Sequence, residues 1–269
     1  MDKLKQLMTK IEARVKARSE NENKPNVSTE GRELINNTVT KSNALSRAYY
    51  RFGLVEKRVM EALISQLNPQ SHPNELQAIV LKATDYSKIF NVSEKHSYDH
   101  LGNAVDALMH RVITVIEPNK IIKMNITTEA IYEKNKGIIT VTLSPKIVPH
   151  LLGLRSNFTK YPLKISANFK SSYTWRIYEL LVSWAENPKF TDGLIAGWCT
   201  IKFDELCQML GVPISYKFND FDRRVLSVVK IELKQKANIE MEIERIKTSR
   251  KVTHLKFTFA EIRQVVPNV

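Results

Sequence analysis

The sequence predicts an α+β protein of two tandem winged-helix domains, each a helix-turn-helix followed by a β-hairpin wing, behind a flexible N-terminal arm. Three observations predict this fold. Two segments of equal length, 81–92 and 201–212, align without gaps. An amphipathic helix pattern precedes each segment, and a further helix pattern and alternating apolar runs follow it. The same elements in the same order, twice, indicate a duplicated unit rather than a chance similarity.

Length and charge limit the class of protein. The chain has 269 residues, enough for two small domains, and 43% of them are hydrophobic, so a buried core can form. Lysine and arginine number 41 against 28 aspartates and glutamates, which gives a net charge of +13. This surplus indicates a polyanionic partner, with nucleic acid first and an anionic membrane surface second. A basic surface without a partner has the same composition.

The sequence carries no signal for export, for a membrane span or for a cofactor. The start, Met1–Lys5, lacks the apolar stretch of a signal peptide, and no stretch approaches the ~20 apolar residues that span a bilayer. Cys199 and Cys207 have no spacing typical of a zinc site, so we expect thiols in a reducing compartment. We therefore expect a cytoplasmic protein without a membrane partner, cofactor or metal.

Residues 1–40 are predicted to be a flexible basic and polar arm. Apolar residues recur at helical spacing within 1–18, and residues 19–37 are polar and read as a linker. A basic amphipathic helix can lie on a membrane or in a partner's groove, but a loosely attached arm needs neither. The compact fold is expected to start near Lys41.

Residues 41–154 are expected to form the first winged helix, and residues 155–269 the second. The first helix of each domain is predicted at 54–67 and at 173–184, where apolar residues recur once per turn and form one stripe.

The two aligned segments predict a short strand and a short second helix in each domain. Each opens with an apolar–lysine pair, after which Thr84 and Asp204 are the expected N-caps. Asn91 and Gly211 stand at the ends of the helices, and these residue types best tolerate the left-handed conformation that terminates a helix. A short helix that stops abruptly is typical of the first half of a helix-turn-helix.

A third helix and a wing complete each domain. The third helices are expected to bury equivalent stripes, which are Tyr98, Leu101, Val105 and Leu108 in the first copy and Phe218, Phe221, Val225 and Val228 in the second. Alternating apolar residues then predict two hairpins, with turns at 133–137 and 247–251.

The two domains differ in the residues expected on the exposed face of the third helix. The first copy is neutral to acidic there, with Asp99, His100, Asn103, Asp106 and His110. The candidate DNA-binding residues all lie in the second copy: Lys217, Asn219, Arg223, Arg224, Ser227, Lys230 and Lys234 on the helix, and Lys247, Ser249, Arg250 and Lys251 at the wing.

These residue types suit contact with double-stranded DNA. In the major groove arginine can form two hydrogen bonds with guanine, and asparagine can form two with adenine. A basic wing can bind phosphates. An ordinary solvated helix face has similar charges, and on such a face Asp220, Asp222 and Glu232 would pair with the basic side chains. Asp222 could also orient the guanidinium group of Arg223. We favour DNA contact because the helix and the wing are basic together.

No set of residues predicts an active site. His96 and His100 have the spacing of two metal ligands but no third ligand, and no glycine-rich phosphate loop precedes a Lys-Ser or Lys-Thr pair. No His-apolar-His segment is paired with a downstream tyrosine, which argues against DNA nicking. Tyr49 and Tyr50 are expected to pack at the first helix. We therefore expect a protein that is not an enzyme.

The chain resembles the replication initiators of iteron-containing, theta-replicating bacterial plasmids, the group that includes the mini-F type initiator. The resemblance runs from about residue 43 to 262. It is carried by AYYRFGL (48–54), FTKYPL (158–163), SYTWRIYELL (172–181), DFDRRVL (220–226) and THLKFTF (253–259).

The resemblance implies two winged helices joined by a linker near 155–164. It implies that the C-terminal domain reads the origin repeats from a helix like 218–234, and that the N-terminal domain supports DNA contact in monomers and forms the interface of a homodimer. Monomers would initiate replication and recruit host replication proteins, and dimers would repress the initiator's own promoter at an operator. The chain departs from the family in its long polar arm and in its poorly basic first-domain helix.

We therefore predict a plasmid replication initiator that binds direct repeats, the iterons. Two alternatives stay open. A dedicated transcriptional repressor would use the same helix as a dimer on a palindrome. A DNA-nicking, relaxase-type enzyme is the less favoured alternative.

Overall fold

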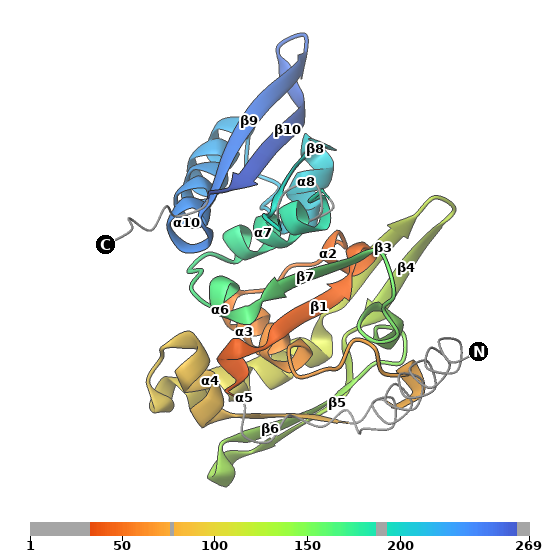
Figure 1. The fold of residues 1–269 in the computed structure, drawn as a ribbon, viewed down its shortest axis with the longest axis vertical. Helices are drawn as coiled ribbons and strands as arrows, with labels where there is room; N and C mark the ends of the chain where they lie inside the picture. The colour runs from red at the N-terminus through yellow and green to blue at the C-terminus, as the bar shows by residue number, and fades with distance from the viewer. Residues whose placement is uncertain (1–32, 76–77, 187–192, 263–269) are drawn as a thin grey trace, which may run out of the picture.

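The computed structural model describes residues 33–75, 78–186 and 193–262, so the helix expected within residues 1–18 lies outside them. Two winged helices follow one another along the chain, as predicted. In Figure 1 the C-terminal one lies above the N-terminal one, and strands β1 (Thr38–Ser42) and β7 (Phe158–Pro162) run between them.

The first winged helix is built on three main helices and a small antiparallel sheet of order β2-β6-β5. Its elements are α3 (Leu54–Ile64), β2 (Ile79–Lys82), α4 (Ala83–Phe90), α5 (Glu94–His110), β5 (Thr127–Glu133) and β6 (Ile138–Leu143). Strands β5 and β6 form the expected wing. A further hairpin of β3 (Val112–Glu117) and β4 (Lys120–Asn125), which the sequence did not predict, separates α5 from that wing.

The second winged helix repeats this arrangement with a sheet of order β8-β10-β9. Its elements are α7 (Ser172–Ser183), β8 (Ala196–Lys202), α8 (Phe203–Leu210), α9 (Phe218–Phe221), the π-helical turn η5 (Asp222–Leu226), α10 (Ser227–Ala237), β9 (Ile239–Thr248) and β10 (Lys251–Glu261). Elements α9, η5 and α10 are consecutive and form one helix, which we call the basic helix. It takes the place that α5 has in the first domain.

Strands β1 (Thr38–Ser42) and β7 (Phe158–Pro162) form a separate two-stranded sheet. The resemblance implied a linker at 155–164, but residues 158–162 of this segment form β7, which pairs with β1 over its whole length and turns Thr159 and Tyr161 into the core. The ordered fold also starts before Lys41, since Thr38 already pairs with Pro162. Short helices complete the set: η1 (Leu34–Asn36), α2 (Asn43–Ser46), η2 (Pro73–Glu75), η3 (Lys134–Lys136), η4 (Val148–His150) and α6 (Leu163–Ser166).

The stops of the second helices are confirmed. Asn91 has a φ of 49° and Gly211 a φ of 61°, so both take the left-handed conformation that ends a helix. The predicted N-caps are wrong. Lys82 and Lys202 hold the cap positions without a side-chain hydrogen bond, and Thr84 and Asp204 lie inside the first turn.

The predicted stripe of the basic helix is wrong at its last residue. Phe221 and Val225 are fully buried, but Val228 is 39% exposed and Val229 takes the buried place one turn later. The π-helical turn η5 explains the difference, because it adds a residue to one turn and rotates everything after it. In α5 the stripe is buried except for Tyr98, whose ring covers Gly137 of the wing turn.

A buried ionic cluster lies where α7 meets β1 and α3. Nζ of Lys57 lies 2.6 Å from the carboxylates of both Glu61 and Glu179, and Nζ of Lys41 bonds the same two groups. Nη1 of Arg176 lies 2.9 Å from Glu179. Burial alone would raise the pKa of Glu179, but these three cations outweigh it and hold the pKa well below its ordinary value. The cluster therefore ties α7 to the first domain through charges that water does not reach.

Candidate nucleic-acid interface

The candidate DNA-binding residues form one exposed, basic surface on the second winged helix. The side chains of Arg223 and Arg224 are 71% and 54% exposed on the first turns of the basic helix. All of the remaining candidates are exposed too: Lys217, Asn219, Ser227, Lys230, Lys234, Lys247, Ser249, Arg250 and Lys251. The structure brings the helix group together on one side of the helix, whereas the wing group lies at the far end of the β9–β10 hairpin.

Asp220 holds the two arginines in position. Its Oδ1 accepts a hydrogen bond from Nη2 of Arg223 (3.2 Å) and lies 3.8 Å from Nε of Arg224. Nη1 of Arg224 also donates to the hydroxyl of Tyr216 (3.3 Å), and this bond raises the pKa of Arg224 further. Exposed pairs of this kind contribute little to stability because water screens them, so the guanidinium groups can leave Asp220 for another acceptor. The guanidinium groups of Arg223 and Arg224 are therefore oriented and available to bind another acceptor.

Arg245 on β9 is a part of this surface that we did not predict. Its Nη2 donates to Oδ2 of Asp222 (3.0 Å), and its guanidinium carbon lies 5.0 Å from the ring centre of Phe218. The suggestion that Asp222 orients Arg223 is therefore wrong, because Asp222 binds the wing strand instead. A signal existed: Arg245 continues the alternation of Ile239, Met241 and Ile243, so its side chain points toward the helices.

A small hollow of about 320 Å³ lies between the basic helix and β9. Arg223, Ser227 and Lys230 line it from the helix, and Arg245 lines it from the strand. The Ser227 hydroxyl donates to the backbone carbonyl of Arg223, one turn earlier. The Asp222 carboxylate lines it too, so three cations face one carboxylate, and this excess of positive charge favours an anionic group there.

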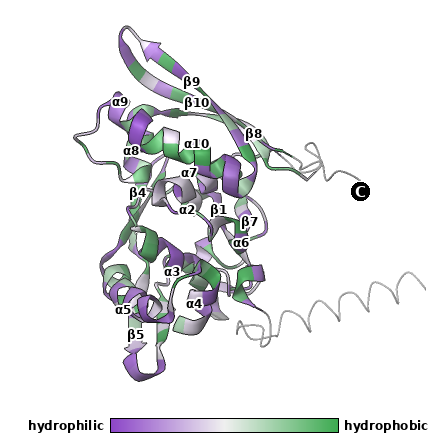
Figure 2. Cartoon of the chain, turned by 90° about the vertical axis from the view of Figure 1, so that its left-hand side faces the viewer, coloured by the Kyte–Doolittle hydropathy of each residue, from purple (hydrophilic) through white to green (hydrophobic). Residues whose placement is uncertain are grey.

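The wing extends well beyond the rest of the second domain (Figure 2). Strands β9 and β10 pair up to Thr248 and Lys251, and Ser249 takes a left-handed φ of 57° in the turn between them. Lys247, Arg250 and Lys251 are therefore grouped at the end of the hairpin, with no ion pair to a described residue.

Two further charged residues of the basic helix also have partners within the protein. The carboxylate of Glu232 accepts hydrogen bonds from the backbone N–H groups of Lys170 (2.9 Å) and Ser171 (3.3 Å), so it anchors the start of α7 rather than neutralising the surface. Nζ of Lys234 lies 2.8 Å from Oε1 of Glu240, but the two side chains are 67% and 54% exposed. An ion pair this exposed does not hold the lysine firmly.

Sequence models of one protein family cover both winged helices. The model described as "Initiator Replication protein, WH1" matches residues 38–182, and the one described as "Initiator Rep protein, WH2" matches residues 202–259. The chain belongs to this family of replication initiators. The family that the sequence predicts is therefore confirmed, as are the two winged helices.

Two relatives from Escherichia coli resemble this initiator. One, named "PI protein", is 23% identical over 250 residues, which cover 81% of this chain and 80% of the relative. The other, named "Uncharacterized 27.6 kDa protein", is 26% identical over 156 residues, or 53% of this chain and 65% of the relative. A crystal structure of the Pi initiator protein in complex with iteron DNA has the same fold, with a TM-score of 0.68 at 20% identity. The match covers 85% of this chain and 99% of that one.

The WH1 match includes β7 and nearly all of α7, both of which lie in the range 155–269 that we predicted for the second domain. Helix α7 contacts β7 and α2 on one side, and α10 and β8 on the other. The boundary near residue 155 stays a prediction.

The first domain of the initiator has no matching basic surface on its third helix. Asp99, Asn103 and Asp106 are exposed on α5, and Nδ1 of His100 lies 3.3 Å from the hydroxyl of Tyr86. The rings of His96 and His100 stack at 6.3 Å. Among the described residues no group of three possible metal ligands occurs.

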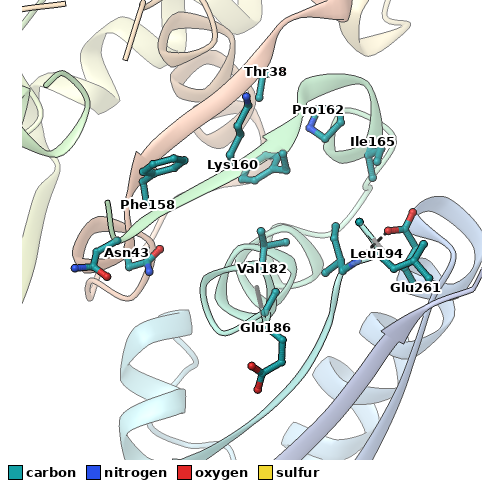
Figure 3. A pocket seen from close by; sticks show the side chains of 15 residues that line it. Thr38, Asn43, Phe158, Lys160, Pro162, Ile165, Val182, Glu186, Leu194 and Glu261 are labelled. Carbon is teal, nitrogen blue, oxygen red and sulfur yellow. Dashed lines mark hydrogen bonds between the residues drawn. The ribbon is translucent and has the colours of Figure 1, made fainter. Parts of the chain in front are cut away.

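The initiator also has a larger hollow of about 850 Å³ between β7 and α7 (Figure 3). Phe158 and Lys160 line it from the strand and Val182 from the helix. Glu261 at its rim accepts a hydrogen bond from the backbone N–H of Ile195 (3.1 Å). None of the candidate DNA-binding residues lies there. In the described part of the chain, no helix combines the length and apolarity that a membrane crossing requires.

Proposed function

We propose that this initiator binds the direct repeats of a plasmid origin sequence-specifically as a monomer, and that it reads them with the basic helix. The observation that carries the proposal is the joint placement of oriented arginines on the helix and exposed cations on the wing of the same domain. Membership of the initiator family supports it, as does the likeness of the fold to a protein solved in complex with iteron DNA.

In this proposal the basic helix lies in the major groove. Arg223 and Arg224 exchange Asp220 for guanine O6 and N7, and Asn219 can fork onto an adenine. Lys230, Lys234 and Ser227, farther along the helix, contact phosphates at the edge of the groove. The hollow beside Arg245 offers a place for a further phosphate.

The wing holds the duplex without reading it. Lys247, Arg250 and Lys251 contact neighbouring phosphates, and Ser249 shapes the turn that presents them. Each lysine or arginine on a phosphate releases counterions, so these contacts make binding depend steeply on salt.

The rest of the proposed activity concerns assembly. A homodimer through the first winged helix represses the initiator's own promoter at an operator, whereas monomers on the repeats recruit host replication proteins. The initiator marks the origin without catalysis.

Gel-shift titration on two duplexes tests the proposal, one with direct repeats and one with a single inverted repeat. Monomer binding to the direct repeats supports an initiator. Binding only as a dimer to the inverted repeat would favour a dedicated repressor. Nicking of supercoiled origin DNA with a divalent metal, abolished by Tyr49→Phe, would show a relaxase-type enzyme instead.

A further inference from the structure

The basic helix exposes two apolar side chains among its polar ones. Val228 is 39% exposed and Ile231 is 57% exposed. They are three residues apart, so they lie on the same side of α10, and we call them the apolar pair. The core of the domain does not use them, because Val225, Val229 and Leu233 fill the buried side of the same helix.

The π-helical turn accounts for this exposure. Helical spacing from Phe221 and Val225 would place Val228 in the core, but the extra residue in η5 turns Val228 outward and Val229 inward. π-turns inside helices often occur at functional sites. Here the turn contains Arg223 and Arg224 and delivers an apolar side chain to the surface one turn after them.

The neighbours of the apolar pair are candidate DNA-binding residues. Arg224 precedes Val228 by one helical turn, and Ser227 precedes Ile231 by one turn. If the basic helix lies in the major groove, as the proposed function requires, the apolar pair faces base edges beside the bases that the arginines contact.

We propose that Val228 and Ile231 recognise the 5-methyl groups of thymines. The thymine methyl is the apolar group that base pairs of ordinary DNA present in the major groove, and an aliphatic side chain is its natural partner. Docking of another protein fits less well, because a specific protein interface buries about 1,000 Å² or more, and this apolar surface is two side chains among charges. A thymine contact needs only one side chain.

The test removes the methyl groups one at a time. The probe is a duplex selected from a library with a randomised centre by its binding to the wild-type chain. Each thymine is then replaced by deoxyuridine, which lacks only the methyl group. The wild type should lose about fourfold in affinity at one or two positions, the effect of uncovering one buried methyl-sized group. Those losses should vanish in Val228→Ala or Ile231→Ala.

Val80→Ala is the matched control. Val80 is 43% exposed on β2 of the first domain, and its variant should show the same deoxyuridine losses as the wild type. Alanine favours helix, so both helix variants should keep their fold, which circular dichroism checks.

The possible results separate this inference from the proposed function. Site-specific binding without any deoxyuridine effect, or with effects that persist in both helix variants, would overturn the thymine contact and leave the proposed function intact. No preference of the wild type for any selected duplex over random DNA would overturn the proposed function, and the thymine contact with it.

Discussion

Helix α5 and the basic helix hold the same place in the two winged helices, and their exposed sides have opposite character. The first presents Asp99, Asn103 and Asp106, and the second presents Arg223 and Arg224. Both bury an apolar stripe against a short second helix and a wing. The comparison teaches that the buried side of each helix maintains the fold, while the exposed side is free to differ and decides what the domain can bind.

The largest expected effect concerns the two arginines. Arg223→Ala with Arg224→Ala should weaken binding to the selected duplex by about 2–6 kcal/mol, since each forked contact to a base contributes about 1–3 kcal/mol. The matched change on the other helix, Asn103→Ala with Asp106→Ala, should leave affinity nearly unchanged. Gel-shift titration measures both, and equal losses would contradict the asymmetry between the domains.

The second prediction concerns the buried ionic cluster, which ties α7 to the first domain. Glu179→Gln leaves Lys41, Lys57 and Arg176 with too little negative charge, and should lower the free energy of unfolding by about 3–5 kcal/mol. Glu205→Gln is the control: its pair with Lys202 is exposed, so its loss should cost under about 1 kcal/mol. Urea denaturation compares them.

The same cluster predicts a pH dependence. The pKa of Glu179 is depressed in the folded protein, so its contribution to stability is complete above the ordinary carboxyl pKa of about 4.3 and is lost as pH falls through the folded value. The wild type should therefore lose stability below about pH 4 more steeply than Glu179→Gln does. Parallel acid-denaturation curves for the two proteins would contradict this role.

The two wings should differ in how much they contribute to DNA binding, as the two third helices should. Arg250→Ala with Lys251→Ala should weaken binding to selected and random duplexes alike, and flatten the salt dependence by about one to two units. Lys134→Ala with Lys136→Ala on the first wing should do less, since Lys136 already lies 2.6 Å from Glu133. A loss restricted to the selected duplex would place the second wing among the base-reading elements.

The smallest expected effect is at the contact between wing and helix. Asp222→Asn removes the exposed partner of Arg245 and should change the free energy of unfolding by less than about 1 kcal/mol. Affinity for random DNA should rise slightly, because Arg245 loses its competing carboxylate. A large loss of stability would mean that this pair fixes the wing against the helix.

Most of the fold could be predicted from the sequence, because its signals are local. Apolar residues at helical spacing place α3, α5 and α7, and alternation places both wings. Asn91 and Gly211 stop their helices through a backbone preference that each residue type carries in any protein. The N-caps were missed because the chain caps these helices without side chains, for which no residue type is diagnostic.

The candidate site was predictable in composition and less so in geometry. Charge and residue type select Arg223 and Arg224 as candidates, and the structure shows both to be exposed. Their common partner Asp220 is near in sequence, but Arg245 is 23 positions from Asp222 and reaches it only because β9 packs beside the basic helix.

The order of elements, the stops of the short helices and the contrast between the two third helices follow from the amino-acid sequence, since periodicity and charge are properties of neighbouring residues. Packing determines the rest. The π-helical turn that exposes Val228 rotates a helix in a way that regular spacing does not foresee. The burial of Lys41 with Glu179 joins residues 138 positions apart, and a buried charge needs such a partner, which here only the packing of distant segments supplies.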